Sequence, residues 1–156
     1  MATEIERKWV AAQPPPADQL GAGTPLRQGY VAIDGDVSVR VRIAPEQAWL
    51  TIKGGDVGLH RTEVEVDLDP AEAEDLWRHT GGRRLDKTRH RVPVEAYTAE
   101  VDVFGETLAG LCLVEVEFPT VEAAEAFQPP AWFGREVTGQ QRWSNASLAR
   151  YGVPAD

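Results

Sequence analysis

Residues 3–10 read TEIERKWV, and the alternation in this stretch decides how the rest of the chain is interpreted. Successive side chains of a β-strand point to opposite faces of the sheet. Glu4, Glu6 and Lys8 would therefore share one face, with Ile5 and Trp9 on the other. A strand with one face in water gives such a pattern, and so does a strand whose charged face points into a cavity.

The same parity recurs in six further segments that the sequence predicts as strands. The acids on their charged faces, together with those of residues 3–10, are Glu4, Glu6, Glu63, Glu65, Glu100, Asp102, Glu115 and Glu117. The bases are Lys8, Arg40, Arg42, Lys53, Arg61, Lys87, Arg89 and Arg91. The opposite faces are mainly valine, leucine and isoleucine. For one strand a solvated face is the simpler interpretation. Seven such strands, with few uncharged polar residues among the charges, favour a shared interior.

A sheet that closes with these faces inward would enclose a charged tunnel. Ions removed from water must be paired or must bind a ligand, because desolvation costs several kcal/mol per ion. Clustered carboxylates suit hard divalent cations such as Mg²⁺ or Mn²⁺, and clustered Arg and Lys suit phosphate oxygens. The two sets together predict a site for a metal-bound polyphosphate.

Turn and cap residues predict where the hairpins and helices between these strands lie. Asp34-Gly35-Asp36 separates two alternating runs and predicts a hairpin. Asp69-Pro70 predicts the start of a helix over 70–79, and further helices are expected over 121–127 and 145–151. We expect these helices to cover part of the apolar face. The predicted fold is mainly β (α+β), an eight-stranded antiparallel closed tunnel or barrel with a few short flanking helices, and residues 1–156 form a single domain.

Composition narrows the possible partners. The net charge of −9 argues against a nucleic-acid partner bound through a bulk positive field. There is no signal-like start and no apolar run long enough to span a membrane, so we expect no membrane partner and a cytoplasmic location. The single Cys112 allows no disulfide within the chain. An apolar outer face leaves room for a homodimer.

Ordered motifs make the sequence resemble the CYTH domain, also called the triphosphate tunnel metalloenzyme superfamily. EIERK fits its E-x-E-x-K signature, and RQGY, RVR, LTIK, RTEVEV, DKTRHRV, AEVDVF, LVEVEF and EVTGQQRWSN follow in family order. The resemblance runs from Glu4 to about Leu148 and is strongest to compact bacterial members with QGY after the first strand. Trp143 stands where relatives more often carry tyrosine, and we expect only a packing change there.

The resemblance implies metal-dependent hydrolysis of a triphosphate inside the tunnel. By motif position, it gives three metal ligands, Glu4, Glu6 and Glu117. It implies catalytic roles for a second acidic set, Glu63, Glu65, Asp102 and Glu115, in binding a second metal or in orienting water, and a position near the substrate for Tyr30. It implies phosphate contacts from Lys8, Arg40, Arg42, Lys53, Lys87 and Arg89, to which the basic faces add Arg61.

Several functions fit this resemblance. A small-molecule triphosphate, most simply inorganic tripolyphosphate, is the leading substrate. An adenylyl cyclase that converts ATP to cyclic AMP, and a thiamine or nucleoside triphosphatase, use the same kind of tunnel. A non-catalytic polyphosphate-binding module would need the bases but not the paired acids, and a purely structural sheet would need neither.

Overall fold

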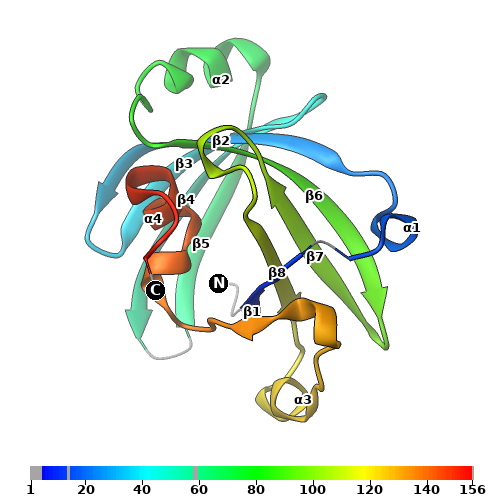
Figure 1. Cartoon of the computed structure of the whole chain (residues 1–156). Coiled ribbons are helices and arrows are strands. Elements are labelled where there is room, and N and C mark those ends of the chain that lie inside the picture. Colours follow the sequence, from blue (N-terminus) through cyan, green and yellow to red (C-terminus); the bar gives the residue numbers. More distant parts are fainter. Residues whose placement is uncertain (1–4, 14, 58–59, 156) are drawn as a thin grey trace.

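The computed structural model describes residues 5–13, 15–57 and 60–155, and its main feature is one strongly curved antiparallel sheet (Figure 1). The strands are β1 (Glu6–Val10), β2 (Thr24–Asp34), β3 (Val37–Ile43), β4 (Ala48–Val57), β5 (His60–Leu68), β6 (Arg84–Val94), β7 (Tyr97–Phe104), β8 (Cys112–Glu117) and β9 (Arg135–Glu136). Their order across the sheet is β5-β4-β3-β2-β6-β7-β8-β1-β9.

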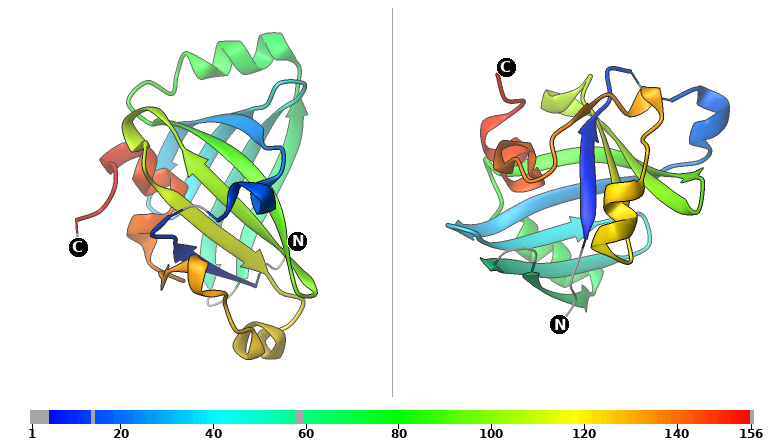
Figure 2. Two further views of the ribbon diagram at one scale, coloured as in Figure 1. Left: turned by 45° about the vertical axis from the view of Figure 1, so that its right-hand side comes forward. Right: turned by 90° about the horizontal axis from the view of Figure 1, so that it is seen from below.

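Short helices lie between and beyond the strands. They are α1 (Ala17–Leu20), α2 (Pro70–Trp77), α3 (Val121–Ala126) and α4 (Asn145–Tyr151), with 3-10 turns η1 (Glu106–Leu108), η2 (Ala131–Phe133) and η3 (Gln141–Trp143). In Figures 1 and 2, α2 lies beyond one end of the sheet and α3 beyond the other. Each helix in the described part of the chain is too short and too polar to span a bilayer.

Local sequence explains the predicted turns and caps. Gly35, with a φ of 60°, makes the tight turn between β2 and β3, where Asp34 is paired with Val37. Asp69 caps α2 by accepting a hydrogen bond from the Glu72 amide, and the Glu72 side chain accepts one from the Asp69 amide in return. The predicted hairpin and the predicted helix start are both confirmed.

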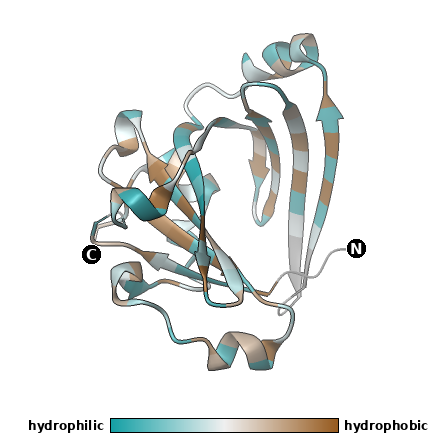
Figure 3. Cartoon of the chain, turned by 90° about the vertical axis from the view of Figure 1, so that its right-hand side faces the viewer, coloured by the Kyte–Doolittle hydropathy of each residue, from teal (hydrophilic) through white to brown (hydrophobic). Residues whose placement is uncertain are grey.

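The strands face the way the parity predicted. Figure 3 shows the alternation of polar and apolar residues along them. The apolar outer face of β1 and β6–β8 packs beneath α3 and η2, with Trp9 1% exposed and its ring centroid 4.7 Å from that of Phe133. On the other half of the sheet, Ala73 and Trp77 of α2 pack on the outer face around Val41.

The inner face changes from charged to apolar at one end of the barrel. Leu85, Phe104 and Leu113 have the same parity as the charged residues of their strands, but they form a buried cluster with Trp143 and Leu148. Helix α4 therefore packs inside this end, which differs from the expectation that residues 145–151 cover the outer face. The reason is that the inner face carries leucine and phenylalanine there, and these side chains form an apolar surface on which α4 packs.

The predicted closure of the sheet is not made by hydrogen bonds. Strand β5 lies at one end of the sheet order and β9 at the other, and no ladder joins them in the described residues. The outer edge of β1 is occupied at its C-terminal end, because Trp9 is paired with Glu136 and Val10 with Arg135 of β9. The sheet therefore wraps around the channel with a seam between β5 and the β1–β9 pair.

Arg7 explains how β9 is held at this edge. Its guanidinium donates to both Glu136 carboxylate oxygens, at 2.9 and 2.7 Å, and to the carbonyls of Ala124 and Phe127, at 2.8 and 2.9 Å. The hydrogen bonds and charge of Glu136 outweigh desolvation and raise the pKa of Arg7. Arg7 thus joins β1, the end of α3 and β9 on the outer side of the sheet.

Candidate active site

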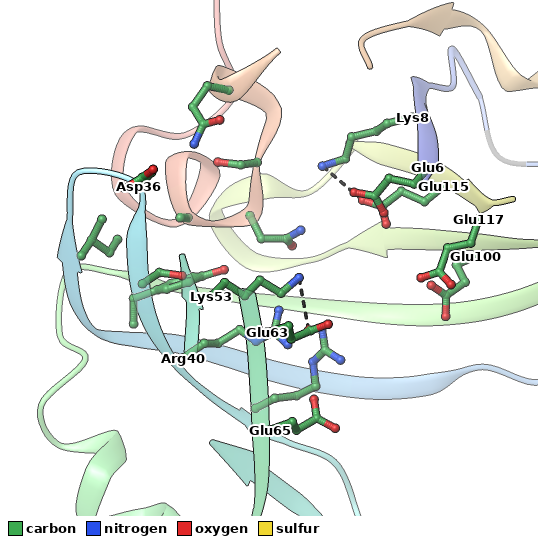
Figure 4. Close-up of a pocket in the computed structure, with 18 of the residues that line it drawn as sticks. Glu6, Lys8, Asp36, Arg40, Lys53, Glu63, Glu65, Glu100, Glu115 and Glu117 are labelled. Carbon is green, nitrogen blue, oxygen red and sulfur yellow. Dashed lines mark ion pairs between the residues drawn. The ribbon is translucent and has the colours of Figure 1, made fainter. Parts of the chain in front are cut away.

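The curved sheet encloses a cavity of about 280 Å³ lined mainly by charged side chains (Figure 4). The charged residues that line it from the strands are Glu6, Lys8, Arg40, Arg42, Lys53, Glu63, Glu65, Arg89, Glu100, Glu115 and Glu117. Tyr30 of β2 and Asn145 at the start of α4 also line it. Strands from both ends of the sheet order therefore meet around one space.

The structure brings together most of the residues predicted for the site. Two of them, Lys87 and Asp102, lie buried beside this cavity without lining it. Glu4 lies outside the described residues, and Arg61 belongs to β5 but its side chain is outside the described part of the chain. The roles of all these residues stay predictions.

Acids and bases pair across neighbouring strands because the register places them opposite each other. Lys8 of β1 is paired with Glu115 of β8, and Nζ lies 3.3 Å from the carboxylate. Lys53 of β4 is paired with Glu63 of β5 at 3.5 Å. Both distances are long for a charge-assisted hydrogen bond, so an anionic ligand could draw these lysines away from their partners at modest cost.

Arg40 and Arg42 add a second group of cations on β3. Arg40 is buried and donates to the Thr51 hydroxyl at 3.3 Å, while its Nε has no partner. Arg42 donates to Gln28 at 2.8 Å and forms no ion pair in the described residues. Burial, with the charges of Arg40 and Arg89, lowers the pKa of Arg42 to about 10. These guanidinium groups carry positive charge that an anion in the cavity would offset.

A buried ion cluster lies beside the cavity. Asp102 accepts hydrogen bonds from Arg89 Nε at 2.8 Å, Arg89 Nη2 at 2.9 Å and Lys87 Nζ at 2.8 Å. Burial alone would raise the pKa of Asp102, but the two cations hold it below its usual range. Burial lowers the pKa of Lys87 to about 7, although Asp102 opposes this change. Burial also lowers the pKa of Arg89, but Asp102 more than compensates and the net change is upward.

Two lysines tie the end of the chain to this site. Lys8 Nζ donates to the Trp143 carbonyl at 2.9 Å, and Lys87 Nζ donates to the Asn145 side chain at 3.0 Å. Trp143 is buried, as a packing role requires, and its indole nitrogen has no hydrogen-bond partner. Sequence reasoning missed Asn145, because a residue at a helix start shows no strand parity.

Glu100 and Thr51 are two further residues to which the predictions gave no role in the site. Glu100 lines the cavity and lies 3.4 Å from both Arg89 and Arg91. Thr51 is buried between Arg40 and Glu65 and donates to Glu65 at 3.2 Å. Strand parity had already placed Glu100 on the inner face, and Thr51 has the same parity as Lys53, but neither residue was given a role in the site.

The acids near the seam are suited to a divalent cation in their chemistry. Burial, together with the charges of Glu100, Glu115 and Glu63, raises the pKa of Glu117, so negative charge is crowded at this place. Glu115 is different: Lys8 is the main reason that its pKa is lowered despite burial. Among the residues whose side chains the structure describes, no group of three or more acids, histidines or cysteines is arranged to hold a metal ion. Oxygen donors in a crowded acidic site nevertheless fit Mg²⁺ or Mn²⁺, and Glu6 and Glu117 are the described candidates.

The structure is an antiparallel, tunnel-like sheet whose acidic and basic side chains face inward. The sequences to which the chain is similar show which class of protein has this arrangement. The inorganic triphosphatase of Nitrosomonas europaea is 43% identical over 150 residues, covering 94% of this chain and 97% of the relative. The inorganic triphosphatase of Acetivibrio thermocellus is 36% identical over 151 residues, covering 96% of this chain and 95% of the relative. No protein-family model matches the sequence.

Solved structures agree with these relatives. The crystal structure of the inorganic triphosphatase NE1496 superposes with a TM-score of 0.74 at 40% identity and covers 96% of both chains. HpAC1 from Hippeastrum, at 16% identity and a TM-score of 0.58 over 78% of this chain and 82% of its own, shows the same fold. The chain belongs to the inorganic triphosphatase family of the CYTH, or triphosphate tunnel metalloenzyme, superfamily.

Proposed function

We propose that the protein hydrolyses inorganic tripolyphosphate to pyrophosphate and phosphate, with Mg²⁺ or Mn²⁺ as cofactor. The observation that carries this proposal is the charged cavity, in which Arg40, Arg42, Lys8 and Lys53 face a group of glutamates. Triphosphate hydrolysis is also the activity named for relatives that match nearly the whole chain. The family suggests a divalent metal requirement, and the choice between the two ions is part of the proposal.

The bases of the cavity bind and position the substrate. Lys8, Arg40, Arg42 and Lys53 come from three strands, so together they can contact several phosphoryl groups of one chain. In phosphoryl transfer the protein contributes mainly by positioning and by stabilising charge on the transferred group. Asp102 already fixes the position of the Arg89 guanidinium through two hydrogen bonds. Substrate binding at Arg89 would therefore cost little side-chain conformational entropy.

The acids have two tasks. Glu6 and Glu117, with Glu4 by motif position, would hold the divalent ion, which supplies charge neutralisation and lowers the cost of deprotonating water. Glu63 and Glu65 face the cavity from β5 and could accept a proton from an attacking water. The water oxygen bonds to the terminal phosphorus, the bridging P–O bond breaks, and pyrophosphate leaves. Asp102 is a weaker candidate base, because Lys87 and Arg89 hold its pKa low.

One experiment tests the reaction class. The protein is incubated with tripolyphosphate, ATP and thiamine triphosphate in turn, with Mg²⁺ or Mn²⁺, and both phosphate and cyclic AMP are measured. We expect phosphate release from tripolyphosphate, and cyclic AMP instead of phosphate would support the cyclase. Absence of any product would refute an enzymatic function.

A single substitution tests the acidic ligands. Glu6→Gln keeps the size of the side chain but removes its charge, and we expect tripolyphosphate turnover to fall by about 100-fold or more, because a metal ion supplies several kcal/mol to such reactions. Glu122→Gln is the matched control, since Glu122 is an exposed residue of α3. Turnover of Glu6→Gln close to that of the control would contradict the assignment of Glu6.

A further inference from the structure

Gln28 is a buried polar residue that the proposed chemistry does not use. It is the first residue of the QGY motif, lies on β2 and is 0% exposed. It has the same parity as Tyr30, which lines the charged cavity, and the register places it opposite Arg42 of β3. Buried polar groups are normally satisfied by hydrogen bonds, so the contacts of this amide indicate what it does.

The Gln28 side chain forms a hydrogen bond with an arginine that is predicted to bind phosphate. Its Oε1 accepts from Arg42 Nε at 2.8 Å, while its Nε2 is buried and has no partner among the described residues. Because a guanidinium has donors only, the amide oxygen must face Arg42 and the NH₂ group must point away from it. An unsatisfied buried donor lowers stability, and a methionine of similar length would fill the space without that cost. The amide is therefore explained by Arg42 and not by the packing of the fold.

Gln28 engages only the Nε atom of the Arg42 guanidinium. Neither terminal nitrogen of Arg42 has a hydrogen-bond partner in the part of the chain that the structure describes. Arg42 lines the charged cavity. Its two terminal nitrogens form a planar pair of donors that matches two oxygens of a phosphoryl group. Gln28 thus fixes the guanidinium and leaves this pair of donors for a ligand.

A neutral amide affects an arginine differently from a carboxylate. Arg89 donates through Nε and Nη2 to Asp102, which offsets its charge. Burial lowers the pKa of both arginines, but Asp102 more than compensates for this at Arg89 and only partly at Arg42. Gln28 orients Arg42 without adding a negative charge beside it. The positive charge of Arg42 is therefore left for an anion in the cavity to offset.

We propose that Gln28 is a positioning residue for substrate binding. Its neutral amide holds the Arg42 guanidinium in the orientation that binds a phosphoryl group, and it leaves the positive charge of Arg42 to the substrate. This inference rests on the proposed function, because the triphosphate must contact Arg42. Gln28 does not itself line the cavity, so it acts only through the arginine.

Two substitutions separate the hydrogen bond from the charge. Gln28→Met keeps the length of the side chain and removes the acceptor, whereas Gln28→Glu keeps an acceptor and adds a carboxylate that offsets the charge of Arg42. Arg42→Met measures how much the arginine itself contributes. Gln19→Glu is the matched control, because it adds the same negative charge at an exposed position of α1.

Two measurements are made on each protein after urea unfolding has confirmed that it is folded. The first is the steady-state kinetics of tripolyphosphate hydrolysis with Mg²⁺, which gives kcat and KM. The second is calorimetric binding of diimidotriphosphate with Mg²⁺. The P–N–P bridges of this analogue resist hydrolysis, so its binding is measured without turnover.

We expect Gln28→Met to weaken binding by about 2-fold to 10-fold, because the substrate must then order a mobile arginine. Gln28→Glu should weaken binding by about 10-fold or more, because its carboxylate competes with the substrate for Arg42. In both variants KM should rise while kcat changes by less than about threefold, since Arg42 contacts the bound substrate as well as the transition state. Gln19→Glu should resemble the wild type in both measurements.

A double substitution shows whether Gln28 acts through Arg42. Once Arg42→Met is present, adding Gln28→Met should weaken binding by less than about twofold, because no guanidinium remains to be positioned. The same loss in both backgrounds, or a Gln28→Met protein that binds as tightly as the wild type, overturns the proposal. This comparison uses only Gln28→Met, so it decides the question even where Gln28→Glu does not fold.

Failure of this inference differs from failure of the proposed function. A wild type that hydrolyses tripolyphosphate, with independent losses from Gln28→Met and Arg42→Met, overturns the role of Gln28 and leaves the triphosphatase function in place. A wild type that binds diimidotriphosphate with coupled losses, but releases no phosphate from tripolyphosphate, supports the role of Gln28 and overturns the function.

Discussion

Replacing Asp102 with asparagine removes the carboxylate that Lys87 and Arg89 share. Asp102 is 5% exposed, and the side chain of Lys87 is fully buried. Loss of one partner of a buried ion pair typically costs about 3–5 kcal/mol, because the remaining charge is left uncompensated. Asparagine keeps the shape and one oxygen acceptor, so we expect a loss of about 3 kcal/mol in the free energy of unfolding. For a domain of this size that corresponds to a fall of roughly 6–12 °C in Tm.

The pH dependence of this loss gives a sharper test. In the wild type, burial lowers the pKa of Lys87 from 10.5 to about 7, so below pH 7 the lysine is protonated in both the folded and the unfolded protein. Without Asp102 the folded pKa of Lys87 falls further. The folded variant then binds fewer protons than the unfolded chain just below pH 7, and its stability declines as the pH falls there. The gap between wild type and variant should therefore widen from pH 7 toward pH 5.5, by at most about 1.4 kcal/mol per pH unit.

Urea unfolding followed by fluorescence at several pH values measures both effects. Asp75→Asn is the matched control, because Asp75 pairs with Arg78 where both side chains are more than two-thirds exposed, at 71% and 73%. Its unfolding should stay close to that of the wild type at every pH. An Asp102→Asn protein as stable as this control, or a loss that does not change between pH 5.5 and 8, would refute the reasoning.

Two further predictions concern the segment that carries β9. Arg7→Gln removes the bonds to Glu136 and to the carbonyls of Ala124 and Phe127, so we expect a loss of about 1–3 kcal/mol in urea unfolding; stability equal to that of Arg78→Gln would contradict this role. Gly134→Ala should destabilise by more than about 1 kcal/mol, because φ is 81° and a Cβ would overlap the Val10 carbonyl. The matched change is Gly139→Ala, where φ is also positive but the Cβ meets no other atom, and an equal loss in the two variants would show that the overlap does not matter.

The sequence predicted the inner face of the barrel because strand parity is a local property. Glu6, Lys8, Glu63 and Lys53 each follow from alternation within their own strand, and the structure places all four at one cavity. The helix over residues 70–77 could be predicted for the same reason, since its cap and first turn lie within four residues of each other.

What could not be predicted depends on contacts between distant segments. Strand β9 is two residues long, too short for any periodicity, yet it pairs with the C-terminal end of the β1 edge that closure of the sheet would need. Nothing in the sequence explained why Arg7 lies on the apolar face. In the structure its guanidinium donates to a carbonyl of α3 and to the carboxylate of Glu136. Helix α4 packs inside the barrel against Leu85, Phe104 and Leu113, and these residues lie on three segments that are far from α4 in the sequence.

The seam between β5 and the β1–β9 pair has a mechanical consequence. No ladder hydrogen bond crosses it in the described residues, so its two sides can move apart or together while every strand keeps its backbone partners. In a hydrogen-bonded barrel the girth is fixed by strand number and stagger. Here no such constraint acts at the seam, and the cavity that the sheet surrounds is lined by Glu6 and Glu117 from one side of the sheet order and by Glu63 from the other. The width of the channel can therefore change with the charge of the ligand that it contains.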